Sequence, residues 1–281
     1  MTDPQGLPPA EPCFLQGAAG PVFAIYFPPP GASAARAVIV VPPFAEEMNR
    51  SRRMLALQAR RLAAAGIGAL ILDLYGTGDS AGDFADARWE TWVEDVAVAA
   101  RWLNGRGVRD IGMLGLRFGA LLASAVQRQA GLRCFRTVFW QPVILGRAAL
   151  TEFLRLNVGA GLLGRESGGT MDLMRARLEA GENVEVAGYA LPPALAAAIQ
   201  KLDLSSYADE TVGPVTWLEI VRSAGDALSI PGSQCVERWT TAGVAVDAAG
   251  IEGRPFWIGQ SITLVPELLA ATTRAFVGSG A

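Results

Sequence analysis

The chain has 281 residues, of which 51% are hydrophobic and 18% are charged. This length fits one large α/β domain with an insertion or two small domains, and the composition supplies a sizeable core and argues against long disordered tracts. The formal net charge is −3, with arginine far outnumbering lysine. Such a balance lacks the basic footprint of a nucleic-acid-binding protein, so we expect no nucleic-acid partner.

The cysteines and the first residues bear on the compartment. The chain has an odd number of cysteines without C-x-x-C spacing, namely Cys13, Cys134 and Cys235. This pattern is typical of buried free thiols in a reducing compartment. The segment 1–12 is polar and proline-rich, unlike a signal peptide. No run approaches the ~18 apolar residues of a membrane span. We therefore expect a cytoplasmic protein with no transmembrane segment.

The first part of the chain predicts two strands followed by a helix. The apolar segment 21–27 and the β-branched run 37–41 (AVIVV) are each stopped by prolines, as expected of strand ends. A continuous apolar run is typical of a strand buried on both faces. The helix that follows can be capped by Asn49 or Ser51 and reaches Ala65.

The middle of the chain continues the alternation. A second buried strand is expected at 67–72, and the apolar positions within 89–103 recur at helical spacing, which predicts an amphipathic helix of about four turns. Asp86 is a candidate cap for that helix. A short strand at 110–114 and a helix at 116–128 follow.

The remaining elements repeat this order after a long gap. Strands are expected at 137–145, at 215–221 and within 244–251, with helices near 233–242 and 264–276. Alternating strands and helices predict an α/β fold with a mostly parallel central sheet and helices on both faces.

The gap at 146–213 interrupts the alternation. It contains three helical pieces and a short strand-like stretch, at 148–156, 171–178, 193–202 and 184–189. We interpret it as a mainly helical cap inserted over the carboxyl end of the sheet, where ligands bind in open α/β folds. The predicted division is a core of residues 1–145 and 214–281 and a cap of residues 146–213.

One motif stands out where the strand at 110–114 meets its helix. Gly115-Leu116-Arg117-Phe118-Gly119 has the frame of the G-x-S-x-G nucleophile elbow, in which a serine stands at the centre. Here the centre is Arg117, and the chain contains no histidine. A serine–histidine hydrolase therefore cannot be assembled from this chain alone.

Other motifs occur in the same order as in a known superfamily. Residues 73–82 (DLYGTGDSAG) resemble its D-x-R-G-x-G-x-S-x-G turn, and Gly225-Asp226 with Pro231 resembles its acid loop. Residues 253–258 fall where its histidine loop follows the last strand. In this register the chain resembles the α/β-hydrolase superfamily, which implies the α/β-hydrolase fold.

A narrower resemblance is to the exosortase A system-associated hydrolase 2 family. It is carried by residues 41–52 (VPPFAEEMNRSR), 115–120, 186–189 and 255–257. This resemblance implies a link to exopolysaccharide and PEP-CTERM protein-sorting loci in Gram-negative bacteria. It implies a locus and a fold, and names no substrate.

The substitutions at the resembled triad positions remove its chemistry. A guanidinium stays protonated and has no lone pair, so Arg117 cannot act as a nucleophile. Ile258 and Gly259, in the expected histidine loop, cannot act as a base, and Asp226 at the acid position has no histidine to orient. Pro43, in the expected oxyanion loop, has no N–H to donate. The sequence leaves open whether the chain is an enzyme.

Arg117 must also be compensated electrostatically. It lies at a helix N-terminus, where the dipole disfavours a cation by ~0.3–1 kcal/mol, and a buried charge needs partners. Three carboxylates belong to loops expected to meet the elbow, Glu46, Glu47 and Asp226, and we expect at least one to pair with Arg117. Either the pair simply fills the site, or Arg117 binds an anionic group of a ligand with the help of backbone N–H groups.

Four aromatic residues are candidate ligand contacts beside Arg117. They are Phe44, Phe118, Trp140 and Trp257, and the two tryptophans could form a wall for a sugar or acyl chain, although core packing is the default interpretation. No metal site is expected, because histidine is absent and the carboxylates lack ligand spacing. Gly76 and Gly78 lack the third glycine of a dinucleotide fingerprint, and no cofactor is expected.

Three functions remain open. The first is a catalytically degenerate hydrolase that binds a small molecule, a lipid-linked saccharide intermediate or a partner protein. The second is an atypical hydrolase of an ester or acyl substrate, in which Glu46, Glu47 or Asp226 activates water and Arg117 binds the developing anion. The third is a scaffold that docks a partner hydrolase.

Overall fold

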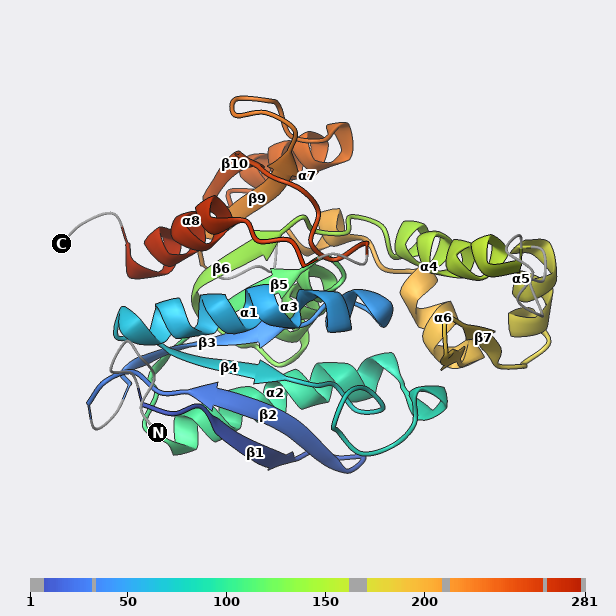
Figure 1. The fold of residues 1–281 in the computed structure, drawn as a ribbon, viewed down its shortest axis with the longest axis horizontal. Helices are drawn as coiled ribbons and strands as arrows, with labels where there is room; N and C mark the ends of the chain where they lie inside the picture. Colours follow the sequence, from blue (N-terminus) through green and yellow to red (C-terminus); the bar gives the residue numbers. More distant parts are fainter. Residues whose placement is uncertain (1–7, 32–33, 162–170, 209–212, 260–261, 279–281) are drawn as a thin grey trace.

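The computed structural model describes residues 8–31, 34–161, 171–208, 213–259 and 262–278, with the side chains of 157–161 excepted. The expectation about segment 1–12 falls partly on residues 1–7, which lie outside this range. An eight-stranded sheet runs through the molecule (Figure 1). Its strands, in order across the sheet, are β1 (Glu11–Gln16), β2 (Pro21–Phe27), β4 (Gly68–Leu72), β3 (Arg36–Val41), β5 (Asp110–Leu116), β6 (Cys134–Trp140), β9 (Val215–Val221) and β10 (Val246–Glu252).

The sheet is mostly parallel, as predicted. β1 pairs with β2 and β2 with β4 in antiparallel register, and the pairs from β4 to β10 are parallel. Strand β1 was not predicted. It lies at the edge of the sheet, and Leu15 is its only buried residue, so it carries little of the apolar signal that marks the central strands.

Helices cover both faces of this sheet (Figure 1). One face packs against α1 (Glu46–Ala64) and α8 (Pro266–Val277), and the other against α2 (Trp89–Gly105), α3 (Gly119–Gln129) and α7 (Ile230–Thr241). Strand β3 shows why a continuous apolar run is needed. Val38 and Val40 join the core under α1 and α8, whereas Ile39 and Val41 join the core on the opposite face.

Several predicted boundaries were wrong. Helix α1 begins at Glu46 rather than at Asn49 or Ser51, because Ala45 turns the chain there with φ 47° and ψ −120°. Acidic residues in the first turn then complement the helix dipole. Asp86 does not cap α2, because it ends the short 3₁₀ helix η1 (Phe84–Asp86).

Two strands also end elsewhere than predicted. β5 continues to Leu116, so α3 begins only at Gly119. β6 starts at Cys134 and ends at Trp140, since Gln141 takes φ 44° and leaves the extended conformation.

The segment between β6 and β9, which we call the cap segment, is mainly helical in its described residues. Its elements are α4 (Gly146–Gly161), α5 (Met171–Glu179), β7 (Val184–Val186), β8 (Tyr189–Leu191), α6 (Pro193–Gln200) and η2 (Leu204–Tyr207). The strand predicted at 184–189 is a hairpin, since Ala187 and Gly188 both have positive φ, as a tight hairpin turn requires. In Figure 1, α4, α5 and α6 lie together beside the sheet rather than over one of its faces.

The helices also answer the question of a membrane span. Within the described residues, no helix combines the length and the apolar character that crossing a bilayer requires.

Candidate functional site

The turn between β5 and α3 has the steric requirements of a nucleophile elbow. A Cβ on Gly115 would lie 2.8 Å from the backbone of Ala120, and a Cβ on Gly119 would collide with the carbonyl of Val41. Between them Arg117 takes φ 54°, a conformation that L-residues rarely adopt. The two glycines let the turn pack this tightly, so the G-x-R-x-G spacing has a physical cause.

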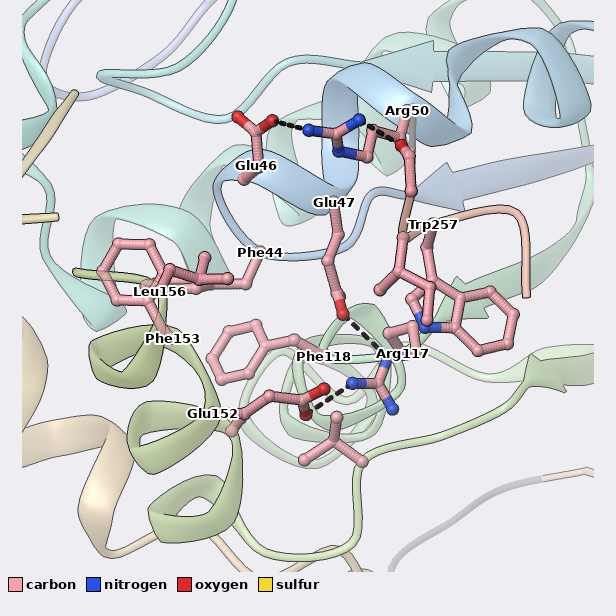
Figure 2. A pocket seen from close by; sticks show the side chains of 14 residues that line it. Phe44, Glu46, Glu47, Arg50, Arg117, Phe118, Glu152, Phe153, Leu156 and Trp257 are labelled. Atoms are coloured by element: carbon pink, nitrogen blue, oxygen red, sulfur yellow. Dashed lines mark hydrogen bonds and ion pairs between the residues drawn. The ribbon is translucent and has the colours of Figure 1, made fainter. Parts of the chain in front are cut away.

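Two carboxylates hold the guanidinium at the elbow. Arg117 Nε donates to Glu47 Oε1 at 3.0 Å, and Arg117 Nη2 donates to Glu152 Oε2 at 2.8 Å (Figure 2). The Arg117 side chain is only 13% exposed, and its guanidinium lies 5.4 Å from the ring centre of Trp257. The charge is therefore both buried and paired, as a buried guanidinium must be.

The expected ion pair is present, and one of its partners was missed. Glu47 is one of the three carboxylates proposed for Arg117, but Glu152 is not. Glu152 comes from α4, in the cap segment, and no motif marks it. Glu46 lies in the first turn of α1 and pairs instead with Arg50 at 2.6 Å.

Asp226 is not brought to the site. Its carboxylate is exposed and accepts a hydrogen bond from the backbone N–H of Ser223 at 2.9 Å, so it stabilises its own turn after β9. It does not line the cavity beside Arg117. Asp226 is therefore not a partner of Arg117, because an exposed turn holds its side chain locally, and among the three expected carboxylates Glu47 is the one that pairs with Arg117.

Burial and pairing act on the ionisable groups in opposite directions. Burial raises the pKa of Glu47 to about 7, and the nearby Arg117 guanidinium opposes that rise without cancelling it. For Arg117, burial lowers the pKa, but Glu47 and Glu152 together outweigh burial and raise it above its usual value. At neutral pH the arginine is therefore cationic, and burial favours the protonated form of Glu47 more than that of an exposed glutamate.

A cavity of about 170 Å³ opens beside these charges (Figure 2). One part of its wall is charged and the other is apolar. Its lining residues are Phe44, Glu46, Glu47, Arg50, Arg117, Phe118, Val143, Ala149, Glu152, Phe153, Leu156, Trp257, Ile258 and Gly259. The cavity thus joins the start of α1, the elbow, helix α4 and the loop after β10.

Three of the four predicted aromatic contacts line this cavity. Phe44, Phe118 and Trp257 do so, but Trp140 does not. Trp140 is 1% exposed and donates from Nε1 to Thr272 Oγ1 at 2.7 Å, because its position on β6 points it into the core under α8. Phe153, on α4, was not predicted, and its ring packs against Phe44 at 5.0 Å.

The loop after β10 reaches the elbow, as the resemblance implied. Trp257, Ile258 and Gly259 all line the cavity, and Arg50 donates to the carbonyl of Gly259 across its edge. None of the three side chains can accept a proton at neutral pH. The site therefore has neither a hydroxyl nucleophile at the elbow nor a base at the histidine position.

The structure also bears on two other chemistries. In the part of the chain that it describes, no three His, Cys, Asp or Glu side chains form a group that could hold a metal ion. Ser80, in the turn after β4, accepts from the N–H of Phe23 at 2.8 Å and donates to the carbonyl of Asp73 at 2.6 Å. Ser80 is thus a turn residue.

No protein-family model matches the chain, and no curated protein matches it in sequence. Solved structures do match it in fold. Est1E from Butyrivibrio proteoclasticus with bound ferulic acid has a TM-score of 0.66 at 14% identity, over 94% of this chain and 98% of that one. A thermostable carboxyl esterase from Bacillus coagulans, in complex with glycerol, has a TM-score of 0.64 at 13% identity, over 95% and 96%.

A third similar structure is an α/β serine hydrolase without a lid, XC6422 from Xanthomonas campestris. Its TM-score is 0.56 at 16% identity, over 98% of this chain and 99% of that one. These likenesses extend over nearly the whole length of each protein. The chain has the α/β-hydrolase fold.

Proposed function

We propose that this protein is a catalytically degenerate α/β hydrolase that binds a ligand in the cavity beside Arg117. The observation that carries the proposal is the guanidinium fixed at the elbow by Glu47 and Glu152. In active members of the fold, this position presents a serine hydroxyl to a carbonyl. A permanent cation paired to two carboxylates offers no nucleophile and takes up the space in which one would act.

The cavity supports binding rather than a site filled only by its ion pairs. Beyond the paired charges it retains about 170 Å³ enclosed mainly by aromatic and aliphatic side chains. Concave, largely apolar sites with a few convergent polar groups are typical of small-molecule binding. The ligand that we propose is a small molecule rather than a lipid-linked saccharide intermediate, because the cavity has the volume of a group of about one ring.

The biological setting that we propose is exopolysaccharide export and PEP-CTERM protein sorting. Its support is the sequence resemblance carried by residues 41–52, 115–120, 186–189 and 255–257. Deletion of the gene in a host that carries such a locus is expected to reduce exopolysaccharide secretion or the sorting of PEP-CTERM proteins. Unchanged secretion and sorting would remove this setting and leave the binding proposal intact.

Two activity measurements test the absence of catalysis. A fluorophosphonate probe, which labels activated serines, is expected to leave the protein unlabelled, and a panel of short-chain and aryl esters is expected to show no turnover at high protein concentration. Arg117→Ser is expected to stay inactive, because the chain has no histidine to activate a serine. Labelling of the wild type would contradict the proposal.

A second candidate function has one observation in its favour. Glu47 lines the cavity and has a pKa raised by burial to about 7, which suits a general acid or base at neutral pH. In this alternative Glu47 activates water against an ester, and Arg117 stabilises the oxyanion. Ester turnover that Glu47→Gln abolishes, and that the exposed control Glu237→Gln retains, would establish it over the non-catalytic function.

A further inference from the structure

The charges around the cavity are unbalanced. Three carboxylates and two guanidiniums line it, from Glu46, Glu47 and Glu152 against Arg50 and Arg117. Arg50 is engaged with Glu46 and with the carbonyl of Gly259 at one edge. The inner part therefore holds one guanidinium between two carboxylates, and ionisation of both leaves a negative charge in excess.

The two inner carboxylates also keep acceptors free. Glu47 uses Oε1 and Glu152 uses Oε2 for Arg117. Within the described part of the chain, neither Oε2 of Glu47 nor Oε1 of Glu152 accepts a hydrogen bond from another residue. Each ionised carboxylate can accept several hydrogen bonds. The charged wall of the cavity can therefore accept further hydrogen bonds from a ligand that carries N–H or O–H groups.

An anion would meet the opposite situation. A carboxylate or phosphate could approach only the N–H groups of Arg117 that remain, two on Nη1 and one on Nη2, since Nε and one N–H of Nη2 are already committed. It would then lie beside two like charges in a partly desolvated site, where repulsion is weakly screened. The geometry disfavours the interpretation that Arg117 exists to bind an anionic group.

The apolar wall limits the size of the ligand. Phe44, Phe118 and Phe153 come together there, with Phe44 5.2 Å from Phe118 and 5.0 Å from Phe153 between ring centres. Leu156 and Ile258, 46% and 52% exposed, mark the open side. A dry cavity of roughly 150 Å³ is large enough for benzene, so this one accepts a group of about one ring.

We propose that the cavity binds a small organic cation, a ring-sized apolar group that carries a primary amine, with the ammonium donating to Glu47 and Glu152. This inference rests on the proposed binding function and names the ligand class for the same site. The ammonium supplies the donors that the two carboxylates lack and neutralises their excess charge. The apolar group packs against the phenylalanines and leaves Arg117 in its ion pairs.

Binding of such a cation is coupled to the protonation of Glu47. The charged groups that face Glu47 are Arg117 from the elbow and Glu152 from α4, with Glu46 and Arg50 on its own helix. Because burial places the pKa of Glu47 at about 7, a cation bound at pH 6 must displace a proton from it. Affinity is therefore expected to rise about tenfold between pH 6 and pH 8, with release of a proton.

Three probes of one size and different charge test the inference: benzylamine, benzyl alcohol and benzoate. Calorimetry at pH 8 is expected to show benzylamine binding at least tenfold more tightly than benzyl alcohol and to show no binding of benzoate. Repeating the titration in buffers of different ionisation enthalpy reports the proton released at pH 6.5. Glu152→Gln is expected to weaken the affinity for benzylamine about tenfold and to leave the affinity for benzyl alcohol unchanged. Glu237→Gln is expected to change neither affinity.

The outcomes separate this inference from the function on which it rests. Benzoate binding as tightly as benzylamine, or no binding by any of the three probes, overturns the cationic ligand while the protein stays a non-catalytic binder. Ester turnover or fluorophosphonate labelling overturns the non-catalytic function itself. Since Glu152 is 59% exposed, its replacement leaves the core intact, and a loss of benzylamine affinity can be assigned to the missing charge.

Discussion

Glu152, on helix α4, reaches across to the elbow and accepts a hydrogen bond from Nη2 of Arg117 at 2.8 Å. The pair joins the cap segment to the tightest turn of the sheet. Its two members differ in environment, since the Arg117 side chain is 13% exposed and the Glu152 side chain 59%. The same junction also contains the edge-to-face contact of Phe153 with Phe44. The ion pair and the aromatic contact therefore both hold α4 beside the elbow.

We expect these two contacts to contribute unequally to stability. Glu152→Gln should lower the free energy of unfolding by no more than about 1 kcal/mol, because an exposed carboxylate contributes little. Phe153→Ala should lower it by about 3–5 kcal/mol, because its ring is 5% exposed and its loss leaves a cavity. Urea unfolding measures both values. A loss above 2 kcal/mol for Glu152→Gln would mean that the ion pair, rather than the aromatic contact, anchors the cap segment.

Glu47 makes a prediction about pH. Its pKa is raised by burial from 4.5 to about 7, so the folded state binds a proton that the unfolded state releases between these values. Stability from this group is therefore present below about pH 4.5 and is lost as the pH rises through 7. Across that window the unfolding free energy of Glu47→Gln should increase, relative to that of the wild type, by up to about 3 kcal/mol.

Urea unfolding at intervals from pH 4 to pH 8 checks the Glu47 prediction. Other carboxylates titrate in the same range, so only the difference between variant and wild type is informative. Glu237→Gln, on the exposed side of α7, is the matched control, and a pH-dependent difference confined to Glu47→Gln assigns the effect to the buried carboxylate. A flat difference for Glu47→Gln would show that Arg117 keeps Glu47 ionised in the folded protein.

Much of the fold could be predicted because its signals are local. The central strand β3 is apolar from Ala37 to Val41, because helices cover both faces of the sheet there. The elbow is readable because Gly115 and Gly119 face backbone atoms at distances that exclude a side chain. The same logic identified Arg117 as the residue at the corner.

The partners of Arg117 were harder to predict because they depend on tertiary packing. Glu47 follows β3 within a motif, whereas Glu152 lies 35 residues after Arg117 on a helix whose facing direction no sequence pattern fixes. The prediction that Trp140 and Asp226 lie at the site was wrong for a similar reason. Each belongs to the correct strand or loop, but one side chain points into the core and the other remains in its own exposed turn. Proximity along the chain did not determine direction.

A second buried carboxylate with a raised pKa, Asp95 on α2, lies outside the candidate site. It is 1% exposed, Oδ2 accepts from the N–H of Tyr75 at 2.8 Å, and Oδ1 has no hydrogen-bond partner in the described part of the chain. Burial raises its pKa from 3.8 to about 6 despite the Tyr75 hydrogen bond. Ionisation above pH 6 therefore places an incompletely paired charge in the core, and the stability that Asp95 gives at low pH is lost through that range.

The stability of Asp95→Asn relative to the wild type should accordingly increase as the pH rises. Relative to the wild type, its unfolding free energy should shift favourably by up to about 3 kcal/mol between pH 4 and pH 7, as measured by urea unfolding. Asp247→Asn, on the exposed side of β10, is the matched control, and a shift confined to Asp95→Asn assigns the effect to the buried carboxylate. If the two variants behave alike, water or a rearranged side chain must satisfy Oδ1 in solution.

The elbow glycines give a steric prediction that is independent of charge. Gly119→Ala should lower the free energy of unfolding by about 1–3 kcal/mol, because the added Cβ meets the carbonyls of Val41 and Pro42 on a rigid turn. Gly105→Ala is the matched control. Gly105 ends α2 with no atom within 4 Å of the new Cβ, so this change should be neutral or should stabilise by about 0.4–1 kcal/mol. Equal stability of the two variants by urea unfolding would show that the turn can widen, and the close approach that fixes Arg117 at the corner would no longer explain why glycines flank it.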